Sequence, residues 1–204
     1  EDKKRVTNMF IKVLELLNLI RFPIFIGIAL IATEITNLFL GNDWNQHVLV
    51  LQILAFVFLF NTIQSFIGIS ILSSGKSNWN FYNNVIMFPV NLCAIYFGSS
   101  WGILGISISM LIVSVLVILP RYYLIVKPLF NITSKRYLRV IFKDLLILGF
   151  TSLLLTKLLN HIEISNLLNA IIKISCLMMI YITYLLLFNR KIITYTKSIF
   201  YERS

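Results

Sequence analysis

Six long apolar stretches occupy most of this 204-residue chain, and they limit what it can fold into more than any other feature. Hydrophobic residues make up 58% of the sequence, mean hydropathy is +0.87, and only 13% of the residues are charged. One soluble core of this size could not hide so much apolar surface, whereas lipid solvates apolar side chains and requires only that backbone groups be satisfied internally. Because the stretches are long and rich in Leu, Ile and Phe, they predict transmembrane helices and not barrel strands.

We therefore predict an all-α, polytopic membrane bundle of six transmembrane helices, forming a single membrane domain over residues 1–204. In chain order the predicted spans are 14–33, 48–72, 84–97, 101–120, 141–158 and 167–188. The third is short for a hydrocarbon core of about 30 Å, but Phe81 and Tyr82 can extend it into the interface. In the fourth, Gly102, Gly105 and Ser109 share one helical face, which is typical of close helix packing.

Lys and Arg are distributed unevenly over the predicted loops, and this distribution predicts the orientation. The 34–47, 98–100 and 159–166 loops contain no Lys or Arg, whereas the N-terminal segment, the 121–140 loop and the C-terminal tail are basic. By the positive-inside rule, both ends and the 73–83 and 121–140 loops lie in the cytoplasm. The net charge of +10 lies beside the apolar runs, so we expect anionic membrane lipids as its partner and no nucleic acid.

The sequence lacks the motifs of two common enzyme classes, since it contains no GxxxxGK[ST] and no HExxH pattern. The two histidines, His47 and His161, fall in different predicted outer loops and do not indicate a metal site. Only eight residues are acidic, and most of them are single and near span ends. We therefore predict a chain that is not an enzyme, without catalytic residues, metal or cofactor.

Polar residues inside the first predicted span are candidates for function, because each is costly in lipid and tends to face protein or water. Asn18 shares a helical face with Glu15, and Arg21 lies beside that face. Arg21 could line a pathway for an anionic, phosphate-bearing substrate, since a guanidinium fork fits phosphate oxygens. Alternatively, it could snorkel toward the cytoplasmic headgroups, with Glu15 as a partner.

The second and sixth predicted spans carry further polar residues. Asn61, Gln64, Ser65 and Gly68 cluster on one helical face, which could line an aqueous cavity or seal a helix–helix contact through amide hydrogen bonds. Lys173, in the outer half of the sixth span, is expected to snorkel outward. The predicted substrate-pathway residues are Arg21, Asn18, Asn61 and Gln64.

An ordered set of short motifs carries a resemblance to a known family. In chain order the motifs are RFP at 21–23, LFLGNDW at 38–44, LQILAF at 51–56, QS at 64–65, ILSSGK at 71–76 and WGILG at 101–105. In this order and spacing, residues 1 to about 140 resemble the C-terminal half of Wzx-type bacterial polysaccharide flippases. Those proteins are members of the multidrug/oligosaccharidyl-lipid/polysaccharide exporter superfamily.

The resemblance implies one lobe of a two-lobe transporter around a central cavity. Such proteins move undecaprenyl-diphosphate-linked oligosaccharide across the bacterial inner membrane, for surface polysaccharides such as the O-antigen of lipopolysaccharide, by alternating access driven by an ion gradient. The implied partners are the lipid-linked oligosaccharide, membrane lipids and the N-terminal lobe of the same protein. Because the sequence begins at Glu1 without an initiator Met, we expect it to be the later part of a longer protein.

Two other classes of function remain open at this stage. A six-span permease subunit that works with a separate ATPase would need a cytoplasmic coupling helix, which the 121–140 loop could supply. A membrane glycan polymerase or ligase would need a substantial outer loop with charged catalytic groups, and the predicted outer loops are short. The flippase is the first hypothesis, the permease subunit the second, and the polymerase or ligase the last.

Overall fold

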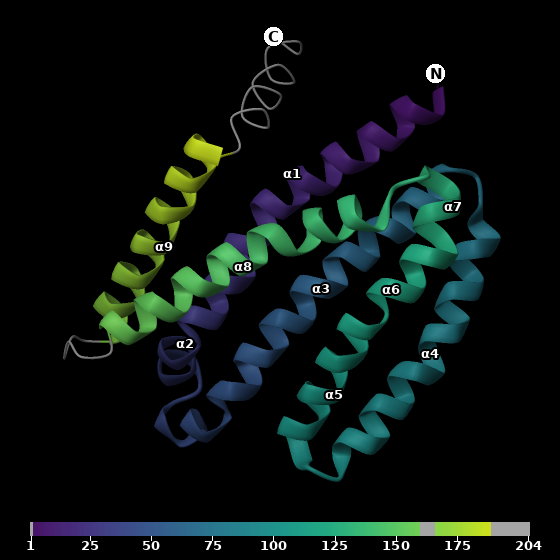
Figure 1. Ribbon diagram of the computed structural model, residues 1–204. Helices are drawn as coiled ribbons and strands as arrows, with labels where there is room; N and C mark the ends of the chain where they lie inside the picture. Colours follow the sequence, from purple (N-terminus) through teal and green to yellow (C-terminus); the bar gives the residue numbers. More distant parts are fainter. Residues whose placement is uncertain (1, 160–165, 189–204) are drawn as a thin grey trace.

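The computed structural model describes residues 2–159 and 166–188, and both ranges are helical apart from short turns and links (Figure 1). The elements in chain order are α1 (Asp2–Leu30), α2 (Ala32–Phe39), the 3₁₀-helix η1 (Asn42–His47), α3 (Val48–Ser73), α4 (Ser77–Ser99), α5 (Gly102–Leu116), α6 (Ile118–Arg121), the π-helical turn η2 (Tyr122–Val126), α7 (Lys127–Phe130), α8 (Ser134–Leu159) and α9 (Asn166–Phe188). The predicted all-α class is therefore confirmed for the described residues. Most of the predicted 159–166 loop and all of the basic C-terminal tail lie outside them.

Four helical stretches in the described part of the chain are long and apolar enough to cross a membrane. They are Lys4–Leu30, Asn42–Ser73, Gly102–Phe130 and Leu168–Leu186, which correspond to the first, second, fourth and sixth predicted spans. Helices α4 and α8 have 23 and 26 residues, but asparagines in α4 and charged residues in α8 lower their hydropathy. The chain is thus a helical membrane bundle, and a total of six spans stays a prediction.

The predicted loop at 34–47 is wrong, because the structure places two helices there. Helix α2 begins directly after α1, and Gly41, with φ of 88°, separates α2 from η1. Such a positive φ is accessible to glycine without steric cost, as expected at a tight turn. Glu34 falls in this predicted loop, but the structure buries it inside α2.

The predicted loop at 121–140 is also wrong, because the helix that begins with α5 continues through α6, η2 and α7 to Phe130. Asn131 then adopts a left-handed conformation, with φ of 48°, and α8 begins at Ser134. The continuation is explained by apolar contacts, since Tyr122 is buried and the Phe130 ring stacks on Phe10 at 4.2 Å. Charge alone does not end a helix whose other face is buried.

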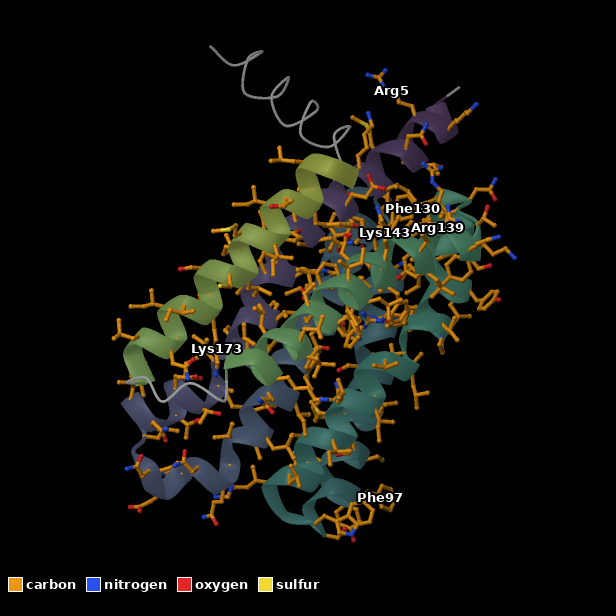
Figure 2. The ribbon with its side chains drawn as sticks, turned by 60° about the vertical axis from the view of Figure 1, so that its left-hand side comes forward. Arg5, Phe97, Phe130, Arg139, Lys143 and Lys173 are labelled. Atoms are coloured by element: carbon orange, nitrogen blue, oxygen red, sulfur yellow. The ribbon has the colours of Figure 1, made fainter. Side chains whose placement is uncertain are left out.

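Helix α3 lies in the middle of the bundle, between α1 and α5 (Figure 1). Helix α4 packs mainly on α5 at one edge, while α8 and α9 pack on the other side of α1. The start of α1, the α3–α4 turn and the α7–α8 link lie at one end of the bundle, and α2, η1 and the α4–α5 turn lie at the other. In Figure 2, Arg5, Arg139 and Lys143 lie toward the first end. The start of α1 and the region around the α7–α8 link, which are the strongly basic segments among the described residues, therefore lie at the same end, as the alternation of charge predicted for them.

The core lies where α1, α3, α8 and α9 meet. Its most buried apolar residues include Leu14, Phe22, Ile26, Leu59, Ile63, Ile71, Ile141, Leu148 and Leu177. Large apolar side chains also cover the outside of the bundle, among them Phe88, Tyr96, Ile112, Leu116, Phe150, Leu153 and Met179. An apolar exterior of this extent fits lipid as the surrounding solvent.

Two glycines allow α4 and α5 to approach each other closely. A Cβ atom on Gly98 would lie only 2.7 Å from the carbonyl oxygen of Gly105, and a Cβ on Gly105 would meet the Gly98 carbonyl. Ser109 joins the same contact, since its Oγ donates to the Ala94 carbonyl oxygen at 2.7 Å. The predicted packing face is confirmed at Gly105 and Ser109. Gly102 is instead the first residue of α5, directly after the turn, with φ of 68°.

We expect Gly98→Ala to destabilise the protein by roughly 1–3 kcal/mol, because backbone atoms that cannot move aside surround the added methyl group. The matched control is Gly149→Ala in α8, where a Cβ meets no atom within 4 Å and alanine favours the helix. The measurement is the thermal unfolding midpoint of the protein, expressed from its complete gene and purified in detergent. Equal midpoints for the two variants would contradict this account of the contact.

Candidate functional site

A polar pocket of about 380 Å³ lies along α3 and α4, on a bundle whose exterior is otherwise mostly apolar. Its lining combines carboxamide side chains with one guanidinium group: Asn61, Gln64, Asn80, Asn83, Asn84, Asn91 and Arg121. Carboxamides both donate and accept hydrogen bonds, and a guanidinium group donates several. We refer to this set as the amide pocket.

The asparagines of α4 reach the amide pocket because of their spacing. Asn80, Asn84 and Asn91 lie four and seven residues apart, and Asn83 adjoins them, so that all four share one helical face. Across from them, Gly68 in α3 removes a side chain where the helices approach, since a Cβ there would lie 3.2 Å from the Asn80 Oδ1. The glycine thus leaves room for an amide at this position.

On the α3 side, the predicted residues Asn61 and Gln64 line the pocket and also contact α5. The Gln64 Nε2 donates to the carbonyl oxygen of Ser114 at 3.2 Å. The Ser114 hydroxyl in turn donates to the Asn61 Oδ1 at 3.3 Å. The two alternatives for this face, a polar cavity and a sealed helix contact, therefore occur together. A role of these residues in a substrate pathway stays a prediction.

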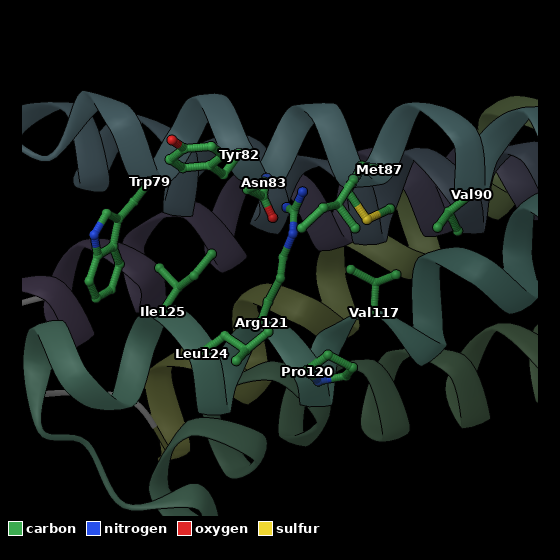
Figure 3. Close-up of a pocket in the computed structure, with 11 residues that line it drawn as sticks. Trp79, Tyr82, Asn83, Met87, Val90, Val117, Pro120, Arg121, Leu124 and Ile125 are labelled. Atoms are coloured by element: carbon green, nitrogen blue, oxygen red, sulfur yellow. The ribbon is translucent and has the colours of Figure 1, made fainter.

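Arg121 is the cationic residue of the amide pocket. It is half-buried at the end of α6, and Figure 3 shows its side chain extending between the helices toward Asn83 of α4. Its Nε is buried and has no hydrogen-bond partner in the described part of the chain. Among the described residues, no carboxylate forms an ion pair with Arg121. The ion pair found there joins Lys173 to Glu34. Oxyanions such as phosphates fit an arginine in this state.

Sequence reasoning missed Arg121, Asn80 and Asn83 because of where the predicted spans began and ended. It also gave no role to Asn84 and Asn91, although both lie in the third predicted span. The fourth predicted span stopped at residue 120, so Arg121 was counted among loop charges. The third began at residue 84, which excluded Asn80 and Asn83. The helical spacing of asparagines through residues 80–91 was the available signal, because polar residues confined to one face do not interrupt a helix.

The other two predicted pathway residues lie away from the amide pocket, where α1 meets α3 and α8. The Asn18 Nδ2 donates to the Val140 carbonyl oxygen at 2.7 Å. The Arg21 Nη1 is 3.5 Å from the Leu59 carbonyl oxygen, and only 5% of the Arg21 surface is exposed. Arg21 therefore does not snorkel to the headgroups in the structure. Arg21 and Asn18 also lie apart from Asn61 and Gln64, the predicted pathway residues of α3.

A buried ion pair ties α2 to α9 near the other end of the bundle (Figure 2). The Lys173 Nζ donates to the Glu34 Oε1 at 2.6 Å, and the two side chains expose only 5% and 4% of their surface. The prediction that Lys173 snorkels outward is therefore wrong. A charge buried this deeply is retained at acceptable cost only when it is paired.

We expect Lys173→Met to destabilise the protein by about 3–5 kcal/mol, because it leaves the Glu34 carboxylate buried without its cation. Adding Glu34→Gln should restore most of that loss, since neither buried charge then remains. Thermal unfolding midpoints of the two single variants and the double variant measure this coupling. Losses that simply add in the double variant would show that the two charges do not depend on each other.

Comparison with known proteins finds similarity to a polysaccharide biosynthesis family and to two bacterial proteins. A family model described as polysaccharide biosynthesis protein matches residues 1–49. The lipopolysaccharide biosynthesis protein WzxC of Escherichia coli strain K12 is 24% identical over 139 residues, which cover 68% of this chain and 28% of WzxC. The resemblance to Wzx-type polysaccharide flippases is confirmed.

A second relative is an uncharacterized membrane protein in the cps region of Klebsiella pneumoniae. It is 29% identical over 133 residues, which cover 63% of this chain and 27% of that protein. The chain thus spans little more than a quarter of the length of these curated relatives. No solved structure matches it. That the chain is the C-terminal lobe of a longer protein of this kind stays a prediction.

Proposed function

We propose that this chain is one lobe of a flippase that moves undecaprenyl-diphosphate-linked oligosaccharide across the bacterial inner membrane for surface polysaccharide synthesis. The chain crosses the membrane six times with both ends in the cytoplasm, and it works by alternating access against an N-terminal lobe of the same protein. It performs no covalent chemistry, so its task is to bind the polar head of the lipid in the membrane and release it on the other side.

The amide pocket is the observation that carries this proposal. Sugar hydroxyls need partners that both donate and accept, which carboxamides supply, and a diphosphate needs a cation with several donors, which Arg121 supplies. Such groups on an apolar membrane bundle suit a ligand that is polar at one end only. The similarity to WzxC, a lipopolysaccharide biosynthesis protein by its name, supports the same class of ligand.

Two features of the bundle favour this function over the alternatives. The segment considered as a coupling helix for a separate ATPase instead continues the helix that begins with α5, as far as Phe130. At the end of the bundle that holds α2 and η1, the α4–α5 connection consists of only Ser100 and Trp101 between the helices. That short turn offers no charged loop of the kind that a glycan polymerase or ligase requires.

We expect Arg121→Ala to lower the delivery of surface polysaccharide by about tenfold or more, because the loss of a charge-assisted contact weakens binding by that order. The assay restores surface polysaccharide in a strain that lacks its own flippase, using the complete gene that encodes this chain. The matched control is Arg139→Ala, which removes an exposed arginine at the basic end without touching the amide pocket. Membrane abundance of each variant is measured in parallel.

If the Arg121 and Arg139 variants restore polysaccharide equally at equal abundance, the amide pocket does not contact the substrate. If the unaltered gene restores no polysaccharide although its product reaches the membrane, the proposed function fails as a whole. These two results are separate, because the first concerns the site and the second concerns the activity.

We also expect Asn84→Leu to reduce polysaccharide delivery severalfold, because it replaces a hydrogen-bonding side chain of the amide pocket by an apolar one. Asn78→Leu is the matched control, since Asn78 is exposed on the same helix and does not line the pocket. The same restoration assay compares the two. A stronger defect in the Asn78 variant would indicate that the hydropathy of α4, and not its pocket face, determines the effect.

A further inference from the structure

A second pocket, of about 470 Å³, lies between α4 and the segment formed by α6 and η2 (Figure 3). We call it the apolar pocket. Most of its lining is apolar or aromatic: Trp79, Tyr82, Ile86, Met87 and Val90 from α4, and Val117, Pro120, Leu124 and Ile125 from the opposite segment. Ile86 and Leu124 expose 63% and 69% of their surface, so the pocket opens on the outside of the bundle, where lipid lies.

The apolar pocket and the amide pocket share two residues, Asn83 and Arg121. The guanidinium group of Arg121 therefore stands at the boundary between them, and its Nε is without a hydrogen-bond partner among the described residues. Across this boundary the surface changes from apolar, to cationic, to carboxamide. That is the order of groups along a polyprenyl diphosphate oligosaccharide, which has a hydrocarbon chain, a diphosphate and sugars.

We propose that the apolar pocket binds the polyprenyl segment next to the diphosphate, while Arg121 binds the diphosphate between the two pockets. The proposal rests on the proposed function for the identity of the lipid, and it adds where the chain of that lipid is held. Charge complementarity selects this occupant, because a single guanidinium group between an apolar and an amide-lined pocket fits an anion flanked by hydrocarbon and sugar. An ordinary phospholipid has only a small polar head beyond its phosphate, which would leave most of the carboxamides without a partner.

The position of the apolar pocket along the bundle indicates from which leaflet the lipid enters. Trp79 lies in the first turn of α4, at the basic end of the bundle, and the Lys76 Nζ lies 4.6 Å from the centre of its ring. The pocket extends from there to Val90 in the middle of α4. It therefore occupies the half of the bundle on the predicted cytoplasmic side. A lipid in the inner leaflet reaches it without crossing the membrane.

The first test is photocrosslinking of tritiated farnesyl diphosphate to the full-length protein in lipid nanodiscs. A benzophenone amino acid replaces Leu124, which lines the apolar pocket, or Leu119, which is 49% exposed and lies outside it. We expect saturable labelling at position 124, and at least tenfold less at position 119. Excess unlabelled farnesyl diphosphate should abolish the labelling, while excess phosphatidylglycerol should not.

Equal labelling at both positions, or competition by phosphatidylglycerol as strong as that by farnesyl diphosphate, would overturn the proposal. Either result would identify the pocket as ordinary lipid-facing surface. Competition by inorganic diphosphate alone, with no competition by farnesol, would also overturn it, because the hydrocarbon chain would then contribute nothing.

The second test fills the apolar pocket. Val117→Phe adds a ring inside it, whereas Val115→Phe makes the same change two residues earlier, at a position that is 38% exposed and outside the pocket. We expect Val117→Phe to weaken the apparent affinity for farnesyl diphosphate about tenfold and Val115→Phe to leave it unchanged. Equal affinities in the two variants would overturn the proposal, and the crosslinking test applies even if Val117→Phe fails to fold.

A third variant separates the contribution of the charge from that of the chain. Arg121→Gln should weaken binding of farnesyl diphosphate about tenfold and leave crosslinking of labelled farnesol unchanged, and Arg121→Lys should fall between Arg121→Gln and the unaltered protein. Equal weakening for both ligands would overturn the assignment of the diphosphate to Arg121.

Failure of this inference and failure of the proposed function give different results. Specific crosslinking at position 124 in a protein that restores no surface polysaccharide would sustain the binding site and reject the function. Full restoration of polysaccharide by Val117→Phe, together with no crosslinking at position 124, would reject the site and sustain the function.

Discussion

Polar groups inside this bundle must find partners within the protein, because the surrounding lipid offers none. The backbone meets this constraint by forming helices in nearly all of the described residues. Short hydroxyl side chains meet it locally, as when Ser70 and Ser107 donate to the carbonyl oxygens four residues earlier. Longer polar side chains cannot do this, so they determine which helices pack together and where the bundle can hold a polar ligand.

The structure accommodates these longer polar side chains in two ways. In the first, the polar group is sealed between helices, as in the Asn18 contact with α8 and the ion pair of Glu34 with Lys173. In the second, the group lines a pocket, as do the α4 asparagines and Arg121. Asn61 and Gln64 combine both, since their bonds to α5 fix side chains that also line the amide pocket. Because these hydrogen bonds already restrict the two side chains, they lose less conformational entropy when a ligand binds.

The sequence predicted the main apolar helices well, because a run of about 20 apolar residues has few folded solutions other than a span. The sequence-based prediction was wrong at the ends of these helices. Residues such as Asn80 and Arg121 were assigned to loops for their polarity, but a polar residue on one helical face leaves the backbone ladder intact. The amide pocket could be predicted only in part for the same reason. Asn61 and Gln64 stood out inside an apolar run, whereas Asn80, Asn83 and Arg121 come from segments that hydropathy had excluded.

Arg21 and Arg121 show that access, and not burial cost alone, distinguishes a binding residue from a structural one. Both guanidinium groups have buried nitrogens without partners among the described residues, so both carry an electrostatic cost. Arg21 is enclosed by α1, α3 and α8 with 5% of its surface exposed, and the pockets described here do not reach it. Arg121 stands where two open pockets meet, so an anion from the membrane can approach it without separating helices. That accessibility, which depends on how α4 lies against α3 and α6, is a property of the packing and has no signature in the local sequence around residue 121.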